Sequence, residues 1–249
     1  MPPKAYMFGM PYECYEQFHV RKYGFHGTSH RFVSMKYGEV TGKSLEGLNI
    51  VSCHLGNGSS ITAIKDGKSV DTSMGFTPLD GIIMGTRSGS VDPSAVEFVQ
   101  NKLGFTPAQM SDYLNKKSGF LGLSGQFSDN RDITSAAQQG DKRSQLVTDM
   151  LTYEIKKYIG SYTAAMNGLD VVIFTGGIGE NAPEVRKGVC ENMEYLGIKL
   201  DSSVNDGLKG KLTKISAPDS KVEVWVIPTN EELLIARDTL EITGLDKNA

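Results

Sequence analysis

Hydrophobic residues recur at helical spacing in one long stretch of the chain. From Asp141 onward, apolar side chains fall at i, i+4, i+8, i+11, i+12 and i+15, which places them on one face of a long helix. These residues are Val147, Leu151, Ile155, Tyr158, Ile159 and Tyr162. The continuously apolar segment DVVIFT at 170–175 follows and predicts a strand buried on both faces.

Apolar and polar residues alternate in three short runs nearer the N-terminus. We predict strands at residues 49–54, 60–65 and 69–72, the last two joined by an Asp-Gly hairpin turn. The glycines of the first turn, GNGS at 56–59, allow positive φ and expose backbone N–H groups, and Ser59 and Ser60 add hydroxyls. The turn is a candidate cradle for phosphate oxygens, with an ordinary Asn-Gly hairpin as the alternative.

Helix-start residues mark most of the helices. Thr28 and Ser29 are N-cap types that precede a short helix with an apolar side. Asp-Pro at 92–93 and Thr-Pro at 106–107 open helices to about residues 103 and 117. Asp132 is predicted to cap another short helix.

The C-terminal part alternates between helices and strands. Residues 176–186, GGIGENAPEVR, turn sharply into a helix that ends near residue 196. Strands are predicted at 198–200 and 222–227, with a polar loop between them. TNEE at 229–232 has capping-box spacing, with Glu232 at the third helical position, and starts a last helix to about residue 241.

The order of the elements predicts an α/β domain with a mixed sheet flanked by helices. Residues 73–93 form a long glycine-rich loop, and loops of this length are usually functional. A second glycine/serine-rich loop is expected at 118–133. Residues 1–20 contain three prolines and are expected to form an extended connection ending in a short helical turn, so the domain itself is residues 21–249.

Composition narrows the class of protein. Of the 249 residues, 39% are hydrophobic and 22% are charged, which is typical of a soluble globular protein. A net charge of −3 without long Lys/Arg runs argues against a nucleic-acid surface. We expect no membrane span and no signal peptide. The three widely spaced cysteines are typical of reduced thiols in a cytoplasmic protein.

Three glycine-rich turns carry the strongest chemical indication: LGNGSS, MGTRSGS and TGGIGENA. Each lies just after a strand or before a helix, where exposed N–H groups can bind phosphate. The Walker sequence of P-loop proteins does not occur. Gly177-x-Gly179-x-x-Ala182, with Asp201 about twenty residues further on, matches the dinucleotide-binding fingerprint and leaves a dehydrogenase as a rival hypothesis.

Four charged or titratable residues are further candidates. His26 and His30 have the i, i+4 spacing of metal ligands, but no third ligand lies nearby in sequence, so a zinc site is the weaker interpretation. Arg87, held among glycines, is suited to bidentate contact with a phosphoryl group. Glu231 has no capping task if Glu232 closes the capping box, and it is a candidate ligand for Mg²⁺.

Several segments together resemble the acetate kinases of the acetokinase family. They are RKYGFHGTSH, CHLGNGSSITAIKDGKSVDTSMGFTPLDG, MGTRSGSVDP, FTGGIGENAPEVR and IPTNEELLIARD, colinear from about residue 21 to the C-terminus. The resemblance implies the ribonuclease-H-like fold of acetate and sugar kinases, actin and chaperone ATPases. It also implies reversible, Mg²⁺-dependent phosphoryl transfer between ATP and acetate, giving acetyl phosphate and ADP.

The resemblance also implies roles for individual residues. His26 and Arg87 would stabilise the transition state, Phe25 and Pro78 would line the pocket for the acetate methyl group, and Glu231 would help to bind Mg²⁺. The residues implied to contact ATP or ADP are His54, Leu55, Gly56, Asn57, Gly58, Asp129, Asn130, Arg131, Gly177, Ile178, Gly179, Glu180 and Asn181. The chemistry needs no general base, because the carboxylate of acetate is itself the nucleophile.

Family members carry an N-terminal lobe before this region, so the resemblance is to their C-terminal lobe, which also forms their homodimer interface. We therefore expect a nucleotide-binding lobe that has very low acetate kinase activity as an isolated chain. Two alternatives remain open. The first alternative to an acetate kinase lobe is a non-catalytic nucleotide-binding and dimerisation module. The second is part of a kinase for propionate or butyrate.

Overall fold

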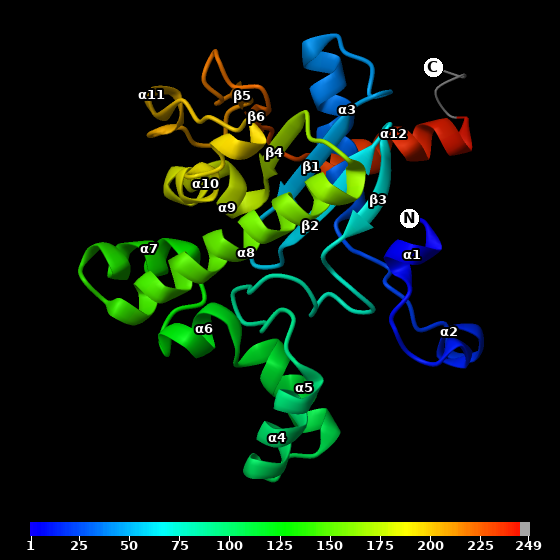
Figure 1. The fold of residues 1–249 in the computed structure, drawn as a ribbon, viewed down its shortest axis with the longest axis vertical. Coiled ribbons are helices and arrows are strands. Elements are labelled where there is room, and N and C mark those ends of the chain that lie inside the picture. The colour runs from blue at the N-terminus through cyan, green and yellow to red at the C-terminus, as the bar shows by residue number, and fades with distance from the viewer. Residues whose placement is uncertain (245–249) are drawn as a thin grey trace.

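A six-stranded mixed sheet forms the centre of the computed structural model, which describes residues 1–244 (Figure 1). The strand order is β3-β2-β1-β4-β6-β5. The strands are β1 (Asn49–His54), β2 (Ser60–Lys65), β3 (Lys68–Thr72), β4 (Val171–Thr175), β5 (Thr213–Lys214) and β6 (Glu223–Val226). The predicted antiparallel meander β1-β2-β3 is confirmed, and β4 runs parallel to both β1 and β6.

Helices cover both faces of this sheet (Figure 1). The long helix α8 packs on one face with α7 and α10, and α3 and α12 cover the other. The helices are α1 (Pro3–Tyr6), α2 (Tyr12–Phe18), α3 (Gly27–Thr41), α4 (Pro93–Leu103), α5 (Pro107–Lys116), α6 (Gly119–Ser124), α7 (Asn130–Gln138), α8 (Lys142–Met166), α9 (Gly176–Asn181), α10 (Pro183–Cys190), α11 (Ser202–Asn205) and α12 (Glu231–Thr243), with a 3₁₀ turn at Glu194–Leu196.

The central strands contribute to two apolar cores because successive side chains point to opposite faces. In β4, Val172 and Phe174 join the core under α8, and Val171 and Ile173 join the core under α3 and α12. All five residues of β4 are buried, as the apolar run predicts. The mixed sheet between two helical layers confirms the predicted α/β class.

The helix starts at Asp92, Thr106 and Asp141 are confirmed, since each side chain accepts a hydrogen bond from a backbone N–H of the first turn. In residues 1–20, the predicted short helical turn at the end is confirmed by α2, whereas the prediction of an extended connection before it was wrong. This segment contains two short helices, because Pro3 occupies the first position of α1 and Pro11 is the N-cap residue of α2, where prolines are accommodated.

Three predicted helix caps were also wrong. His26 is the N-cap residue of α3, and Thr28 and Ser29 lie inside the helix. Asp129, rather than Asp132, caps α7, by accepting from the backbone N–H of Arg131. The observed caps, His26 and Asp129, lie two or three positions before the predicted ones and have the non-helical backbone that a cap requires. Composition alone does not reveal which residue has this backbone.

The remaining corrections fall in short segments. The loop predicted at 118–133 contains helix α6, and the loop at 201–220 contains α11 and β5. Residues 198–200 form two isolated bridges, one parallel to Val222 and one antiparallel to Ser216, so no single strand lies beside them. None of the helices in residues 1–244 is long and apolar enough to cross a membrane.

Leu151 tests the contribution of α8 to the core, because its side chain is fully buried there. Leu151→Ala is expected to lower the free energy of unfolding by about 2–5 kcal/mol through lost burial and the cavity left behind. Chemical denaturation measures the loss. Tyr153→Ala on the same helix is the control, since Tyr153 is 63% exposed. Equal losses in the two variants would contradict the assignment of the buried face.

Candidate active site

The carboxyl ends of β1 and β4 lie side by side, since His54 pairs with Thr175 in the parallel ladder. A glycine-rich turn follows each strand, and the two turns are bonded together. The carbonyl oxygen of Leu55 accepts hydrogen bonds from Ile178 N at 2.8 Å and Gly179 N at 3.3 Å. Gly176 has φ +76°, and a Cβ there would lie 2.7 Å from the Leu55 oxygen, so this position requires glycine.

A cavity of about 980 Å³ opens beside these turns. Eight of the predicted nucleotide-contacting residues line it: Gly56, Asn57, Asp129, Asn130, Arg131, Gly177, Ile178 and Asn181. A further set, which the sequence analysis did not name as nucleotide contacts of the kinase family, completes the wall: Ser128, Thr134, Ser135, Gln138, Ala182, Pro183, Glu184, Gly207 and Lys209. Segments far apart in the sequence therefore meet around one space that is large enough for a small-molecule ligand.

Five predicted nucleotide contacts lie outside the cavity wall: His54, Leu55, Gly58, Gly179 and Glu180. Leu55 is fully buried. The carboxylate of Glu180 accepts from Gly176 N at 3.0 Å and from Thr229 N at 3.2 Å. In this structure Glu180 therefore ties the end of β4 to the segment that leads into α12.

The turn at 56–59 differs in detail from the predicted phosphate cradle. Neither Gly56 nor Gly58 has positive φ. Ser59 is buried and closes the turn on itself, since its hydroxyl donates to the Gly56 carbonyl and accepts from Gly56 N. Ser60 is also buried, among histidines. Added Cβ atoms on Gly56 and Gly58 would have no neighbour closer than 3.3 Å, so neither position excludes a side chain outright, and the Ser59 hydroxyl holds the turn closed.

Gly58 lies between the two predicted catalytic side chains. A Cβ on Gly58 would lie 3.4 Å from His26 Nε2 and 3.3 Å from Arg87 Nη1. The imidazole and the guanidinium therefore approach the same point from different segments. His26 itself has φ +58°, a left-handed conformation that is uncommon for a non-glycine residue and that occurs disproportionately at functional sites.

Arg87 belongs to a loop that is held by backbone hydrogen bonds on several sides. Its Nη1 donates to the Pro78 carbonyl at 2.9 Å, which brings one predicted substrate residue next to it. Phe25 lies on the other side of the site, with its carbonyl oxygen 3.4 Å from Ser60 Oγ. Tyr23 N donates to the Gly75 carbonyl, so the segments that carry Phe25 and Pro78 are neighbours.

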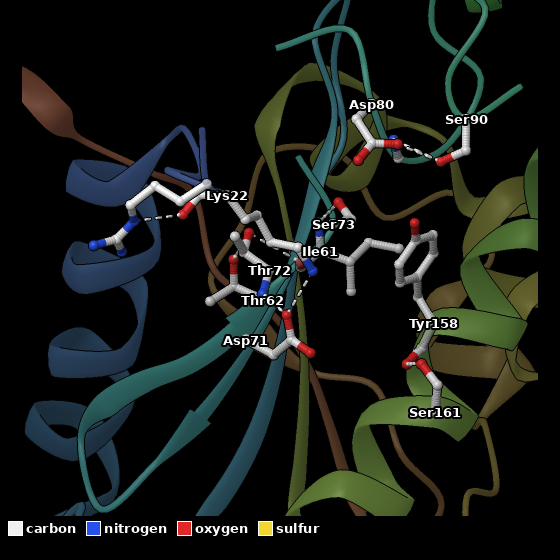
Figure 2. A network of polar contacts seen from close by, with 12 residues as sticks. Lys22, Ile61, Thr62, Asp71, Thr72, Ser73, Asp80, Ser90, Tyr158 and Ser161 are labelled. Carbon is white, nitrogen blue, oxygen red and sulfur yellow. Dashed lines mark hydrogen bonds and ion pairs between the residues drawn. The ribbon is translucent and has the colours of Figure 1, made fainter. Parts of the chain in front are cut away.

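Polar contacts close the base of this loop (Figure 2). Ser90 donates to Asp80 at 2.6 Å, and Gly81 N donates to Ser90 Oγ at 3.1 Å. Figure 2 shows Tyr158 of α8 pointing toward this bonded pair and Lys22 in contact with Asp71 of β3. The loop is attached to the sheet by Ile61 N, which donates to Ser73 Oγ at 2.9 Å, and to the long helix by Ile83 N, which donates to Glu154 Oε2 at 2.7 Å.

Helix α6 forms the other support for the Arg87 loop. Phe120 N donates to the Met84 carbonyl and Leu121 N to the Gly85 carbonyl. Gly119 has φ +59°, and a Cβ there would lie 2.0 Å from the Met84 oxygen and 2.5 Å from the Arg87 oxygen. Gly119 thus determines the position of Arg87, a dependence that the sequence pattern at 118–133 did not reveal.

Three histidines stack beneath the turn at 56–59. The rings of His26 and His54 are stacked with centroids 4.1 Å apart, and His30 meets His54 edge to face. Burial lowers the pKa of His54 to about 4, with a further contribution from His26. Burial also lowers the pKa of His26, helped by the Arg87 charge, and lowers that of His30 strongly. All three rings are therefore neutral at pH 7.

Arg186 of α10 is a fully buried cation behind the cavity. Its guanidinium donates to the Gly179 carbonyl at 2.9 Å, to Asn205 Oδ1 at 2.8 Å and to the Leu208 carbonyl at 2.8 Å. Burial lowers its pKa to about 10. These contacts hold the 205–209 segment against α9, so Arg186 positions Gly207 and Lys209 on the cavity wall.

Glu231, the predicted ligand for Mg²⁺, lies outside the set of residues that line the cavity. Glu231 is the first residue of α12 and is half-buried, and Asn230 supplies the cap by accepting from Leu233 N. The predicted capping box with Glu232 was therefore wrong, but the conclusion that Glu231 has no capping role still holds. The nearby Thr229 Oγ1 is buried without a hydrogen-bond partner in residues 1–244. Mg²⁺ prefers oxygen ligands and retains several waters, so few protein ligands suffice.

His26 and His30 do not form a zinc site with a third residue. Within the described part of the chain, no group of three or more His, Cys, Asp or Glu side chains is placed to hold a metal ion. The two imidazoles instead share Ser60 Oγ as a hydrogen-bond partner, at 2.9 Å from His26 Nδ1 and 2.7 Å from His30 Nε2.

Comparison with known proteins agrees with this arrangement. The acetokinase family model matches residues 1–237. The chain belongs to the acetokinase family. This acetokinase chain is 57% identical over 242 residues to the acetate kinase of Carboxydothermus hydrogenoformans, covering 97% of the chain and 60% of that protein.

Solved structures give the same result. The crystal structure of Porphyromonas gingivalis acetate kinase matches the acetokinase chain with a TM-score of 0.96 and 49% identity, over 98% of this chain and 61% of that one. A propionate kinase from Francisella tularensis matches with a TM-score of 0.89 and 42% identity, over 95% and 60% of the two chains. The chain spans about 60% of the length of the curated relatives that it matches.

The dehydrogenase hypothesis was wrong for this chain. Its first three strands are antiparallel, whereas a dinucleotide-binding half is built from parallel strands joined by helices. Asp201 caps α11 by accepting from Ser203 N and Val204 N, so its carboxylate is occupied within its own turn. The spacing Gly177-x-Gly179-x-x-Ala182 arises instead from a tight β4–α9 connection.

Gly119→Ala tests the dependence of the Arg87 loop on helix α6. The added Cβ would collide with the Met84 and Arg87 backbone, and alanine resists positive φ. We expect the free energy of unfolding to fall by at least about 2 kcal/mol, as measured by denaturation. Gly160→Ala within α8 is the control, because a Cβ there has no neighbour within 4 Å. A Gly119→Ala protein as stable as wild type would show that the loop does not need this contact.

His54 predicts a pH dependence of stability. Its pKa is about 4 in the folded chain against an ordinary 6.5, so the unfolded chain binds the extra proton between these values. The resulting stability is fully present above pH 6.5 and is lost as the pH falls toward 4. Urea denaturation at several pH values in this window gives the free energy of unfolding at each pH. This free energy should change less with pH for His54→Gln than for wild type. Identical pH dependences would mean that His54 does not carry the effect.

Proposed function

We propose that this chain is the nucleotide-binding lobe of a kinase that transfers a phosphoryl group reversibly between ATP and acetate. The observation that carries the proposal is the convergence of His26 and Arg87 on Gly58, next to the cavity bounded by Asn57 and Gly177. The acetokinase family membership supports it. The groups proposed to contact the phosphates do not include a general base. This suits a reaction whose nucleophile is already a carboxylate.

The electrostatics of the two converging groups favour this chemistry. A transferring phosphoryl group spreads negative charge over its equatorial oxygens. A guanidinium and a neutral imidazole N–H fixed near those oxygens stabilise the transition state without reorganisation. Arg87 is half-buried, which strengthens its interaction with a phosphate relative to an exposed arginine.

The cavity walls supply the proposed ATP or ADP site. Asn57 and Gly177 would approach the phosphates through the two glycine turns, and Asp129, Asn130 and Arg131 would border the nucleoside. The cationic side chain of Lys209 adds positive charge to the same wall. Glu231, with the Thr229 hydroxyl, would help to hold the Mg²⁺ that bridges phosphate oxygens and neutralises their charge.

The acyl substrate is proposed to be acetate or another short carboxylate. Phe25 and Pro78 lie on neighbouring segments beside Arg87 and would face the methyl group. The similarity to a propionate kinase supports a slightly longer acid as the second candidate. Formation of a homodimer and a cytoplasmic location stay predictions from the family resemblance.

Calorimetric titration tests the proposal on the 249-residue chain. We expect binding of MgATP and MgADP and none of NAD(H), because we propose that the glycine-rich turns bordering the cavity at Gly56 and Gly177 bind nucleotide phosphates. Ile178→Arg, which fills the cavity wall with a bulky charged side chain, should weaken ATP binding. A chain that binds neither nucleotide would refute the proposal.

Arg87→Ala separates transition-state stabilisation from ground-state binding. In an assay of acyl phosphate formation by the catalytically competent protein that contains this lobe, kcat should fall by at least about 10²-fold, since one charge-stabilising donor is removed. The affinity for ATP should change by less than about threefold, because Arg87 does not line the nucleotide cavity. Equal losses in kcat and affinity would identify Arg87 as a binding residue only.

A further inference from the structure

Buried serines and histidines form a continuous hydrogen-bonded row behind the site. Ser52 Oγ lies 2.9 Å from His30 Nδ1, and His30 Nε2 lies 2.7 Å from Ser60 Oγ. Ser60 Oγ lies in turn 2.9 Å from His26 Nδ1. Ser52 and Ser60 are fully buried and His30 is 4% exposed, so bulk water does not compete for these groups.

The surroundings of Ser52 decide which atom donates in the first hydrogen bond of the row. Among residues 1–244, the Ser52 hydroxyl has His30 Nδ1 as its one hydrogen-bond partner. If Ser52 accepted from His30, its own hydrogen would be buried without an acceptor, a situation that folded proteins avoid. Ser52 therefore donates, and His30 Nδ1 carries no hydrogen.

His30 then donates from its other nitrogen. A neutral imidazole carries one hydrogen, and a charged one would be costly at this buried position, where the ring of His30 has only serine hydroxyls as hydrogen-bond partners among residues 1–244. The hydrogen is therefore on Nε2 and is donated to Ser60 Oγ at 2.7 Å.

The hydroxyl of Ser60 then determines which nitrogen of His26 carries the hydrogen. Its own hydrogen has two possible acceptors, His26 Nδ1 at 2.9 Å and the Phe25 carbonyl at 3.4 Å. The second contact is too long for a normal O–H hydrogen bond. Ser60 therefore donates to His26 Nδ1, which leaves the single hydrogen of a neutral His26 on Nε2, the atom that lies near Gly58 and Arg87.

We propose that the row Ser52–His30–Ser60 fixes His26 in the tautomer that carries its hydrogen on Nε2. Ser60 and His30 are thus positioning residues: they touch no substrate, and they decide which atom His26 presents. Resting on the function proposed above, this makes His26 a neutral donor to a phosphoryl oxygen. The opposite tautomer would present a lone pair, which would repel the same oxygen.

The neighbouring imidazole has a matching support. Ser29 Oγ lies 2.8 Å from His54 Nδ1 and is fully buried, with no other hydrogen-bond partner in the described residues. By the argument used for Ser52, Ser29 donates and His54 carries its hydrogen on Nε2. The stacked pair His26 and His54 is therefore uniform in tautomer.

Nuclear magnetic resonance of the ¹⁵N-histidine-labelled chain decides the proposal directly. The sequence has four histidines, so the two-bond ¹H–¹⁵N signals, which distinguish the tautomers, are few. In wild type we expect the Nε2–H form for His26, His30 and His54. A His26 found as Nδ1–H would overturn the proposal without any variant being needed.

Variants test whether the row transmits the preference. Ser60→Ala should shift His26 toward a mixture of tautomers, and Ser60→Thr should restore the wild-type form because it keeps the hydroxyl. Ser52→Ala should also shift the tautomer of His26, although Ser52 does not contact His26. The control is Ser34→Ala, another buried serine of α3, whose hydroxyl donates to the Arg31 carbonyl. Unchanged His26 signals in folded Ser60→Ala would refute the row.

A kinetic readout distinguishes this inference from the proposed function. In acyl phosphate formation by the catalytically competent protein that contains this lobe, Ser60→Ala should lower kcat by about 10- to 100-fold with the KM for ATP unchanged, and Ser60→Thr should recover most of it. If the tautomers are as expected but no phosphoryl transfer occurs, the proposed function fails and the row stands. An unchanged kcat in Ser60→Ala would show that the tautomer of His26 does not matter for the reaction.

Discussion

The parallel pairing of β1 with β4 is the constraint on which the site depends. It brings His54 and Thr175 to the same edge of the sheet, so the turns that follow both strands leave at one point. The Leu55 carbonyl then accepts from the first turn of α9, which locks the two turns into one unit. Without this pairing, Asn57 and Gly177 would lie on separate loops and would not bound a common cavity.

Charge is distributed unevenly around this unit. The chain as a whole carries a net charge of −3, yet Arg87 and Arg186 donate only to carbonyl, amide and thioether groups in the described residues. The carboxylate of Glu180 is occupied by backbone N–H groups. Arg87, which forms no ion pair in residues 1–244, and the backbone N–H donors of the turns suit an anionic ligand, and the low local dielectric strengthens their effect.

The rigidity of the site comes from glycines and buried polar groups together. Gly119 and Gly176 permit backbone contacts that a side chain would block. Ser59 and Ser60 saturate hydrogen-bonding groups beneath the turn. A buried polar network of this kind defines one arrangement, since each group left without a partner would cost about 1–3 kcal/mol.

The strands and the long helix could be predicted because their patterns are local and strongly periodic. The run 170–175 and the spacing from Val147 to Tyr162 each indicate one element whatever surrounds it. Short helices such as α6 and α11, and the cap at Asp129, could not be predicted. They depend on a few residues whose intrinsic preference is weaker than the tertiary contacts around them.

The sequence by itself determined the α/β order and the three glycine-rich turns, and it identified His26 and Arg87 as candidate site residues. Only the tertiary structure decided that Lys209 and Thr134 share a cavity with Asn57, and that buried serines hold the histidines. The physical reason is the distance along the chain over which each kind of interaction acts. Periodicity and turn chemistry act between neighbours in the chain, whereas a cavity wall and a hydrogen-bonded row arise from contacts between distant segments, whose distances no local pattern encodes.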